Sequence, residues 1–201
     1  KIVLENSIRV DLISSFFNEL NKSTEYAILH HIDKIYSIDD DIDFIVNCSK
    51  EAILEFIKLF VNENNMFLMN HYMIDRDIYR FDLFYSNNNV LEKIELDCAC
   101  NSVGRDLLEI NTRRLLKNRM PLNLNGVNFF KVSQKAEIEY YIKKKAYKNS
   151  DILNYVDYFK TLDISTSKQE IIVQYNKWNK YFKSNLYKIK FLINKIILMF
   201  N

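Results

Sequence analysis

Glycine is almost absent from this chain, with only Gly104 and Gly126 among 201 residues. A Rossmann dinucleotide-binding turn needs two or three closely spaced glycines, and a Walker A loop needs two around its phosphate cradle. The G-x-S-x-G nucleophile elbow and the H-E-x-x-H helix of metalloproteases are not found in the sequence either. The sequence therefore excludes several large enzyme classes, among them those that bind nucleotides through glycine-rich loops.

The composition is that of a folded domain without a strongly basic surface. Hydrophobic residues make up 48% of the sequence and aromatic residues 14%, which is enough for a packed core. The 28 basic and 26 acidic side chains give a net charge of only +2. Proteins dedicated to duplex nucleic acid usually carry a basic face and a high isoelectric point, so we do not expect a nucleic-acid partner.

Cysteine usage and the first residues of the chain indicate its expected compartment. Cys48, Cys98 and Cys100 do not have the spacing of a disulfide framework, and the last two would share one face of a strand as buried thiols. Charged residues interrupt positions 1–9 before any apolar core of a signal peptide can form. A start at Lys1 rather than Met is compatible with an excerpt of a longer protein. The expected setting is reducing and cytoplasmic.

Hydrophobic periodicity predicts an α+β (α/β) fold. Apolar residues with a period of two or in short runs indicate strands, and apolar residues at helical spacing indicate helices. The predicted strands are 26–29, 41–46, 66–72, 79–85, 91–98 and 127–132; the predicted helices are 8–20, 52–60 with Ser49 as its cap, 107–116, 133–145, 152–162 and one from 168 onward. Pro121 is expected to end the region after the 107–116 helix. This order predicts a mixed β-sheet flanked by helices in residues 1–132 and a C-terminal helical region in residues 133–201.

Two aspartates at the start of a predicted strand are the strongest candidates for chemistry. Asp41 and Asp43 are two residues apart, so in a strand they point to the same face, about 6.6 Å apart along the backbone. Carboxylates at this spacing can bind one or two Mg²⁺ ions, which prefer oxygen ligands and lie about 3.5–4 Å apart in two-metal phosphoryl transfer. Asp97, in a later predicted strand, would complete the set, with Asp82 as the competing third acid. The alternative is a solvated strand end that carries no chemistry.

Two arginines and two adjacent histidines are the candidates for substrate binding. Arg80 and Arg105 carry guanidinium forks that match the oxygens of a phosphate. His30 and His31, at the end of the first predicted strand, could hydrogen-bond a phosphate or act as a general base. Adjacent histidines at a strand end are also typical of turns and packing, so both interpretations stay open.

Several short motifs between Tyr26 and Leu162 resemble one known family. The segments 26–33, YAILHHID, and 41–46, DIDFIV, are similar to the start of a nucleotidyltransferase-fold family that occurs with bacterial capsule and exopolysaccharide synthesis genes. Some of its members are fused to a thymidylate-kinase-like domain. The segment 94–98, IELDC, resembles the family strand that carries a third acid. Residues 107–119 and 129–145 are similar to a later helix and a strand–helix pair of the same family.

The resemblance implies the roles of the site residues and the partners. It implies catalytic and metal-binding roles for Asp41, Asp43 and Asp97, with one or two Mg²⁺ ions as cofactor. It also implies a nucleoside triphosphate or nucleotide sugar as donor, an acceptor in surface-polysaccharide biosynthesis, and a fused or partner kinase-like or glycosyltransferase domain. The family commonly has glycine where this chain has His31, and a Cβ at that position hinders the close approach of phosphate oxygens.

Three functions therefore stay open at the level of the sequence. The first is a Mg²⁺-dependent nucleotidyl or phosphoryl transferase. The second is a catalytically degenerate member of the fold that serves as a binding or scaffold module for a partner enzyme, and the altered glycine position favours it. The third is a nucleotide-handling protein of the toxin–antitoxin kind, which would need a helical partner.

The C-terminal segment is both basic and aromatic. No acidic residue follows Glu170, and lysines alternate with large apolar side chains from Lys177 onward. A cationic helix of this kind can pack on its own protein or a neighbouring domain, or lie peripherally on an anionic membrane. The longest apolar run, Ile196 to Phe200, is too short for a transmembrane span.

Overall fold

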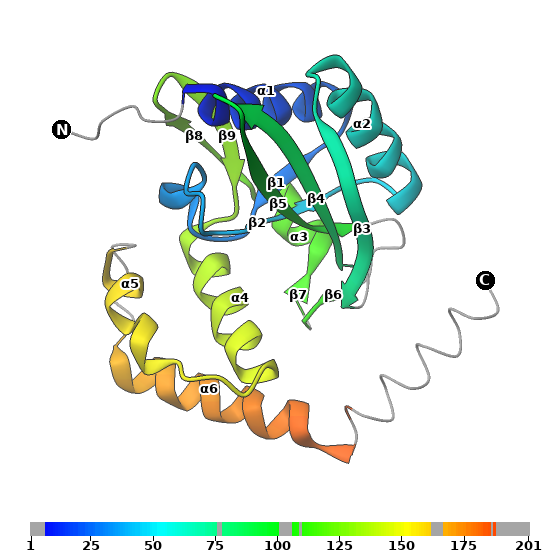
Figure 1. Ribbon diagram of the computed structural model, residues 1–201. Coiled ribbons are helices and arrows are strands. Elements are labelled where there is room, and N and C mark those ends of the chain that lie inside the picture. Colours follow the sequence, from blue (N-terminus) through cyan, green and yellow to red (C-terminus); the bar gives the residue numbers. More distant parts are fainter. Residues whose placement is uncertain are drawn as a thin grey trace. The chain divides into compact units, whose positions relative to one another are not determined.

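The structure is a computed structural model that describes residues 7–75, 78–100, 106–108, 110–161, 167–185 and 187. The chain divides into two compact units, Lys1–Ser133 and Gln134–Asn201 (Figure 1). The first unit contains a seven-stranded sheet, and the elements described in the second unit are all helical.

The sheet of the first unit is mixed, with the strand order β3-β4-β5-β2-β1-β9-β8. Its strands are β1 Tyr26–Ile28, β2 Ile42–Val46, β3 Phe67–Asp75, β4 Ile78–Asn87, β5 Val90–Cys100, β8 Met120–Leu124 and β9 Val127–Lys131. β2 runs parallel to β5, and β1 runs parallel to β9, whereas the other neighbouring strands are antiparallel. A mixed sheet with flanking helices confirms the predicted fold class.

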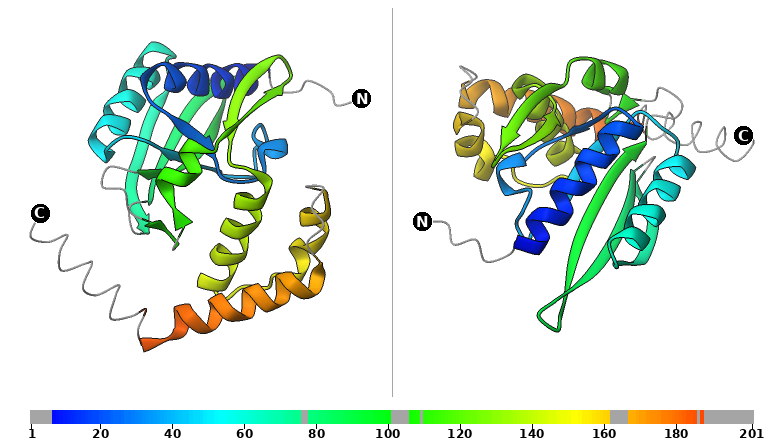
Figure 2. Two further views of the ribbon diagram at one scale, coloured as in Figure 1. Left: turned by 180° about the vertical axis from the view of Figure 1, so that it is seen from behind. Right: turned by 90° about the horizontal axis from the view of Figure 1, so that it is seen from above.

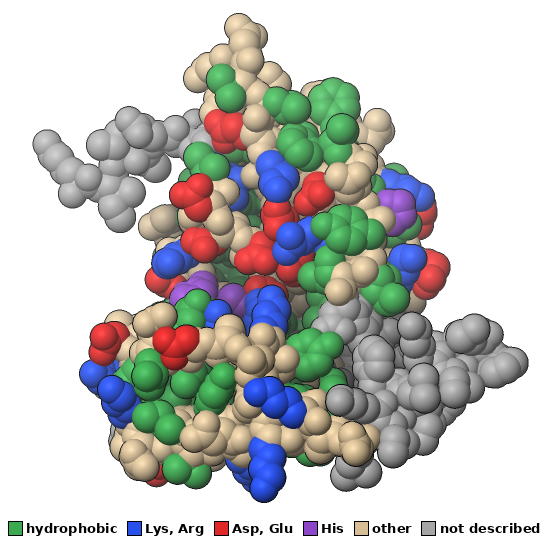
Figure 3. Space-filling model, turned by 60° about the horizontal axis from the view of Figure 1, so that its bottom comes forward, with side chains coloured by type: hydrophobic (Ala, Val, Ile, Leu, Met, Phe, Trp, Pro, Cys, Tyr) green, Lys and Arg blue, Asp and Glu red, His purple; other side chains and the backbone are tan. Residues whose placement is uncertain are grey.

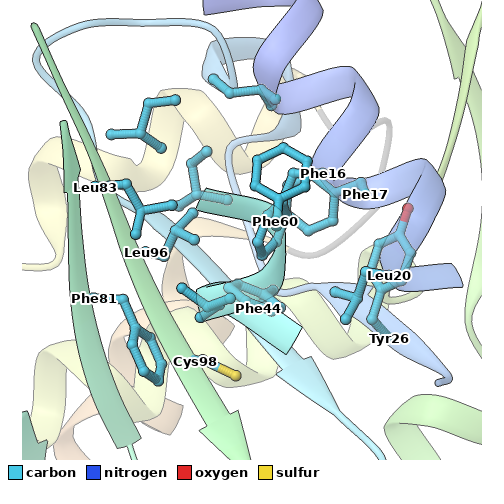
Figure 4. Packing of buried hydrophobic residues seen from close by; sticks show 14 of the residues in the cluster. Phe16, Phe17, Leu20, Tyr26, Phe44, Phe60, Phe81, Leu83, Leu96 and Cys98 are labelled. Atoms are coloured by element: carbon cyan, nitrogen blue, oxygen red, sulfur yellow. The ribbon is translucent and has the colours of Figure 1, made fainter. Parts of the chain in front are cut away.

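Two long helices, α1 Ser7–Ser23 and α2 Lys50–Glu63, cover one face of this sheet (Figure 2). The core between them is rich in aromatic rings, including Phe16, Phe17 and Phe60 from the helices (Figure 4). The ring of Phe44 on β2 makes edge contacts with Phe16 and Phe17, with ring centroids 6.1 Å and 5.4 Å apart. Because side chains alternate along a strand, β2 buries every second residue in this core and turns Asp43 to the opposite face.

The start of α2 is set by a local side-chain hydrogen bond. Ser49 is the N-cap, and its hydroxyl accepts from the backbone N–H of Ala52 at 3.2 Å, as predicted from the sequence. We expect Ser49→Ala to lower the free energy of unfolding by about 1 kcal/mol, because one N–H of the first turn loses its acceptor. Urea denaturation would measure the change. Ser49→Asp, which keeps an acceptor, should leave the stability within a few tenths of a kcal/mol.

The predicted helix over 107–116 is wrong in its first half. Asp106–Leu107 (β6) and Ile110–Asn111 (β7) pair as a short antiparallel ladder, and the helix α3 spans only Thr112–Lys117. Leu108 lies in the left-handed region with φ 48°, which breaks a right-handed helix. The side chain of Asn111 caps α3 by accepting from the backbone N–H of Arg114 at 2.8 Å, so the helix begins after it.

Pro121 does not end the region as predicted, because it lies inside β8. This strand is at the edge of the sheet and pairs with β9 alone among the described strands. An edge strand tolerates proline because one side of its backbone has no partner that needs the missing N–H.

The second unit is held together by its own small core. Its helices are α4 Gln134–Tyr147, the 3-10 turn η2 Leu153–Tyr155, α5 Val156–Thr161 and α6 Lys168–Lys183. The buried core residues are Ile138, Tyr141, Ile142, Ile152, Phe159 and Ile171. None of the helices in the described part of the chain has both the length and the apolar character needed to cross a bilayer. The basic, aromatic segment begins at Lys177, and its residues from 188 onward lie outside the described part of the chain.

Candidate functional site

The three predicted acids lie on one face of the sheet, the face opposite α1 and α2. Asp43 on β2 is in direct register with Asp97 on the parallel strand β5. Asp41 precedes β2 by one residue and lies two residues before Asp43, so it faces the same way. Acidic side chains gather around basic ones on this side of the first unit (Figure 3). Strand register thus brings together carboxylates that are more than 50 positions apart in the sequence.

Arg80 joins this cluster from β4, where it is in register with Asp97. Its Nε and Nη2 donate to the two carboxylate oxygens of Asp97, each at 2.7 Å. Nη2 also donates to Oδ2 of Asp41 at 3.1 Å, and Nη1 forms an ion pair with Glu95. The guanidinium therefore contacts three carboxylates, and its fork binds Asp97 through two parallel hydrogen bonds.

Asp43 has a different partner, His30, which follows β1. Nε2 of His30 lies 2.6 Å from Oδ2 of Asp43, and both side chains are more than nine-tenths buried. The backbone N–H of Leu29 donates to the carbonyl of Asp43 at 2.9 Å, so the end of β1 is fixed against this aspartate. His30 is thus positioned at the carboxylate cluster.

His31 adopts a backbone conformation that favours glycine. Its φ of 52° and ψ of 39° lie in the left-handed region, and the residue caps the short 3-10 helix η1 Ile32–Lys34. A side chain with a Cβ pays roughly 1–2 kcal/mol to stay there. The turn after β1 therefore keeps the geometry of a glycine turn while it carries an imidazole.

The electrostatics of the cluster reflect burial and like charges. Burial raises the pKa of Asp97 to about 6, against the opposing effect of the Arg80 hydrogen bonds, and the neighbouring carboxylate of Asp43 adds to the rise. The pKa of Arg80 is raised above its ordinary value, mainly by its hydrogen bonds to Asp97. Arg80 stays charged at every pH of interest, and Asp97 is poised to exchange a proton close to neutral pH.

We expect the imidazole of His31 to stay neutral in the folded protein down to about pH 4, because burial and then the adjacent His30 lower its pKa from 6.5 to about 4. Between these values the unfolded chain binds more protons, so this side chain's contribution to the free energy of unfolding declines as the pH falls from 6.5 to 4. The raised pKa of Asp97 acts in the opposite sense in this range. A ¹⁵N NMR titration of the ring itself is therefore the measurement, and a midpoint near 6.5 would contradict the expectation.

The carboxylates fit Mg²⁺ in their chemistry and in their placement on one face. Asp41, Asp43 and Asp97 offer only oxygen ligands, which Mg²⁺ prefers. Within the described residues, however, no group of three or more acidic, histidine or cysteine side chains is arranged around a common metal position. Asp41 and Asp97 instead accept hydrogen bonds from the guanidinium of Arg80.

The remaining residues are Asp82 and Arg105, which were predicted as candidates, and Glu95, which was not. Asp82 lies on β4 in register with Glu95, whereas the register partner of Asp43 is Asp97. Arg105 lies outside the described residues. Glu95 was missed as a site residue, although its spacing of two from Asp97 already indicated a shared face.

No protein-family model and no curated protein matches the sequence. Among solved structures, the chain is similar to an antigenic nucleotidyltransferase-like protein from Paracoccidioides brasiliensis, with 14% identity, a TM-score of 0.45, and coverage of 83% of this chain and 74% of that one. It is also similar to ANT(2")-Ia, solved in complex with adenylyl-2"-tobramycin, with 13% identity, a TM-score of 0.48, and coverage of 86% and 96%. At these identities and TM-scores, the likenesses carry neither substrate nor activity over to this chain.

Proposed function

We propose that this chain is a Mg²⁺-dependent nucleotidyl or phosphoryl transferase domain. The observation that carries the proposal is the direct register of Asp43 with Asp97 on parallel strands, with Asp41 on the same face. Carboxylates gathered at one sheet face beside a strand-end turn suit a reaction in which negative charge on a phosphoryl group must be neutralised.

The roles of the residues follow from their contacts. Asp41, Asp43 and Asp97 would hold the Mg²⁺, which when bound supplies positive charge at the transferred phosphoryl group. His30 orients Asp43 through its contact at 2.6 Å. Where Asp97 does not hold an ion, its raised pKa suits it to accept the proton of an acceptor hydroxyl instead. The guanidinium of Arg80 suits phosphate oxygens.

The family resemblance of the sequence extends this proposal to the biological substrate. The donor would be a nucleoside triphosphate or a nucleotide sugar, and the acceptor a component of surface-polysaccharide biosynthesis in a bacterium. A fused or partner kinase-like or glycosyltransferase domain would act with it. The domain would work in the cytoplasm, with peripheral membrane contact through the basic C-terminal segment.

Calorimetry with nucleoside triphosphates in the presence and absence of Mg²⁺ tests the proposal. We expect nucleotide binding that depends on Mg²⁺ and disappears when a chelator is added, since the metal links the carboxylates to the phosphates. Binding that is the same with and without the metal would remove the metal-dependent function. Assaying the four common triphosphates in parallel would identify the donor.

A second candidate is a catalytically degenerate binding or scaffold module for a partner enzyme. Two observations favour it: His31 carries a Cβ in a turn of glycine geometry, and Arg80 already neutralises part of the carboxylate cluster. The same calorimetry separates the candidates, because a pure scaffold gives no metal-dependent heat with any triphosphate.

A further inference from the structure

The position of Arg80 gives this side chain a role beyond phosphate binding. Its guanidinium forms ion pairs with Asp41, Glu95 and Asp97. Two of these, Asp41 and Asp97, belong to the proposed metal ligands. A side chain with one positive charge thus lies among the groups that would otherwise face a divalent cation.

This face still carries more negative charge than Arg80 neutralises. Asp82 lies two residues along β4 from Arg80 and is in register with Glu95, so it shares the face. Its side chain is buried, with the residue 8% exposed. Oδ2 accepts from Nδ2 of Asn70 at 3.2 Å, but the buried Oδ1 has no hydrogen-bond partner among the described residues. Asp82 therefore adds negative charge to this face, on which Lys93 already forms an ion pair with Glu95.

Arg80 lies nearer to solvent than the carboxylate that it binds. Its side chain is 23% exposed, whereas Asp97 beneath it is 5% exposed. The guanidinium therefore lies on the open side of the cluster, where a phosphate can reach it. Leaving Asp97 without another cation would be costly, since a buried carboxylate loses its charge-assisted hydrogen bonds.

We propose that Arg80 is a displaceable counter-cation, which holds the carboxylates in the resting site and moves to the phosphates of an incoming nucleotide when a divalent cation takes its place. A divalent cation alone competes with Arg80 and binds weakly. A cation that arrives with a polyphosphate gives Arg80 a new anionic partner, so the two ligands bind together. The nucleotide half of this inference rests on the proposed function, whereas the competition between Arg80 and the cation does not.

The test compares the binding of Mn²⁺ alone with the binding of Mn²⁺ and a non-hydrolysable nucleoside triphosphate analogue. In Arg80→Gln we expect Mn²⁺ alone to bind about 10-fold more tightly than in the wild type, because the competing charge is gone. The Mn²⁺–nucleotide complex should bind about 10-fold more weakly, because the phosphates lose the guanidinium. Arg80→Lys, which keeps the charge but loses the fork, should lie between the two proteins.

Arg119→Gln is the matched control, since among the described residues Arg119 pairs with Glu25 at 2.7 Å rather than with a carboxylate of the cluster. It should leave Mn²⁺ binding unchanged. If Arg80→Gln folds poorly without metal, its melting temperature should rise on addition of Mn²⁺ more than that of the wild type. An affinity of Arg80→Gln for Mn²⁺ equal to that of the wild type overturns the inference. Tighter Mn²⁺ binding without any nucleotide binding keeps the competition and removes the proposed transferase function.

Discussion

Asp43→Asn should lower Mg²⁺-dependent transfer by about 10²–10³-fold, the scale of losing one preorganised electrostatic contact to the transition state. Asn keeps the shape of the side chain and one oxygen, but it removes the negative charge that faces Asp97 in register. The measurement is the turnover of the donor triphosphate identified by calorimetry, at saturating Mg²⁺.

The fold should survive this substitution. Asp43 and Asp97 are adjacent and both buried, so removal of one charge relieves repulsion between them. Urea denaturation of Asp43→Asn should therefore give a free energy of unfolding no lower than that of the wild type by more than about 1 kcal/mol. Asp39→Asn makes the same chemical change at an exposed position before β2, and it should retain full activity. Unchanged turnover in Asp43→Asn would remove the aspartate from the proposed reaction.

Arg9→Met should lower the free energy of unfolding by about 3–5 kcal/mol. Arg9 on α1 is only 1% exposed, and its guanidinium donates to three backbone carbonyls. The acceptors are Lys93 at 2.7 Å, Tyr36 at 3.1 Å and Ser37 at 2.5 Å. Met fills similar volume but donates no hydrogen bond, so all three carbonyls lose their partner. Chemical denaturation monitored by circular dichroism would measure the loss.

The same substitution should also weaken the candidate site. Tyr36 and Ser37 belong to the segment that leads into Asp41, and Lys93 lies on β5 four residues before Asp97. Arg9 therefore connects the two chain segments that carry Asp41 and Asp97.

Lys58→Met is the matched control, because Lys58 is exposed and pairs only with Glu55 among the described contacts. It should change the stability by less than about 0.5 kcal/mol. Equal losses in both variants would show that the carbonyl contacts of Arg9 contribute little.

Local features of the fold could be predicted from the sequence because they depend on neighbouring residues. The alternation DIDFIV placed Asp41 and Asp43 on one face and Phe44 on the other, since the period of a strand is two. The cap at Ser49 could be predicted because it requires only a hydroxyl three residues before the backbone N–H that donates to it. The helix prediction for 107–116 failed only in its first half. Helical periodicity detects neither the left-handed backbone of Leu108 nor the cap at Asn111 that begins the helix.

What the sequence determined by itself is which residues carry charge and which face of its own strand each one takes. Only the tertiary structure decided that Asp97 rather than Asp82 lies beside Asp43, and that the guanidinium of Arg80 comes between Asp41 and Asp97. The reason is that strand order and register are set by long-range packing of the sheet against α1 and α2, whereas the side-chain period of a strand is a property of the strand alone. A shift of one residue in the pairing of β4 with β5 would turn Arg80 to the aromatic core and remove it from the carboxylates.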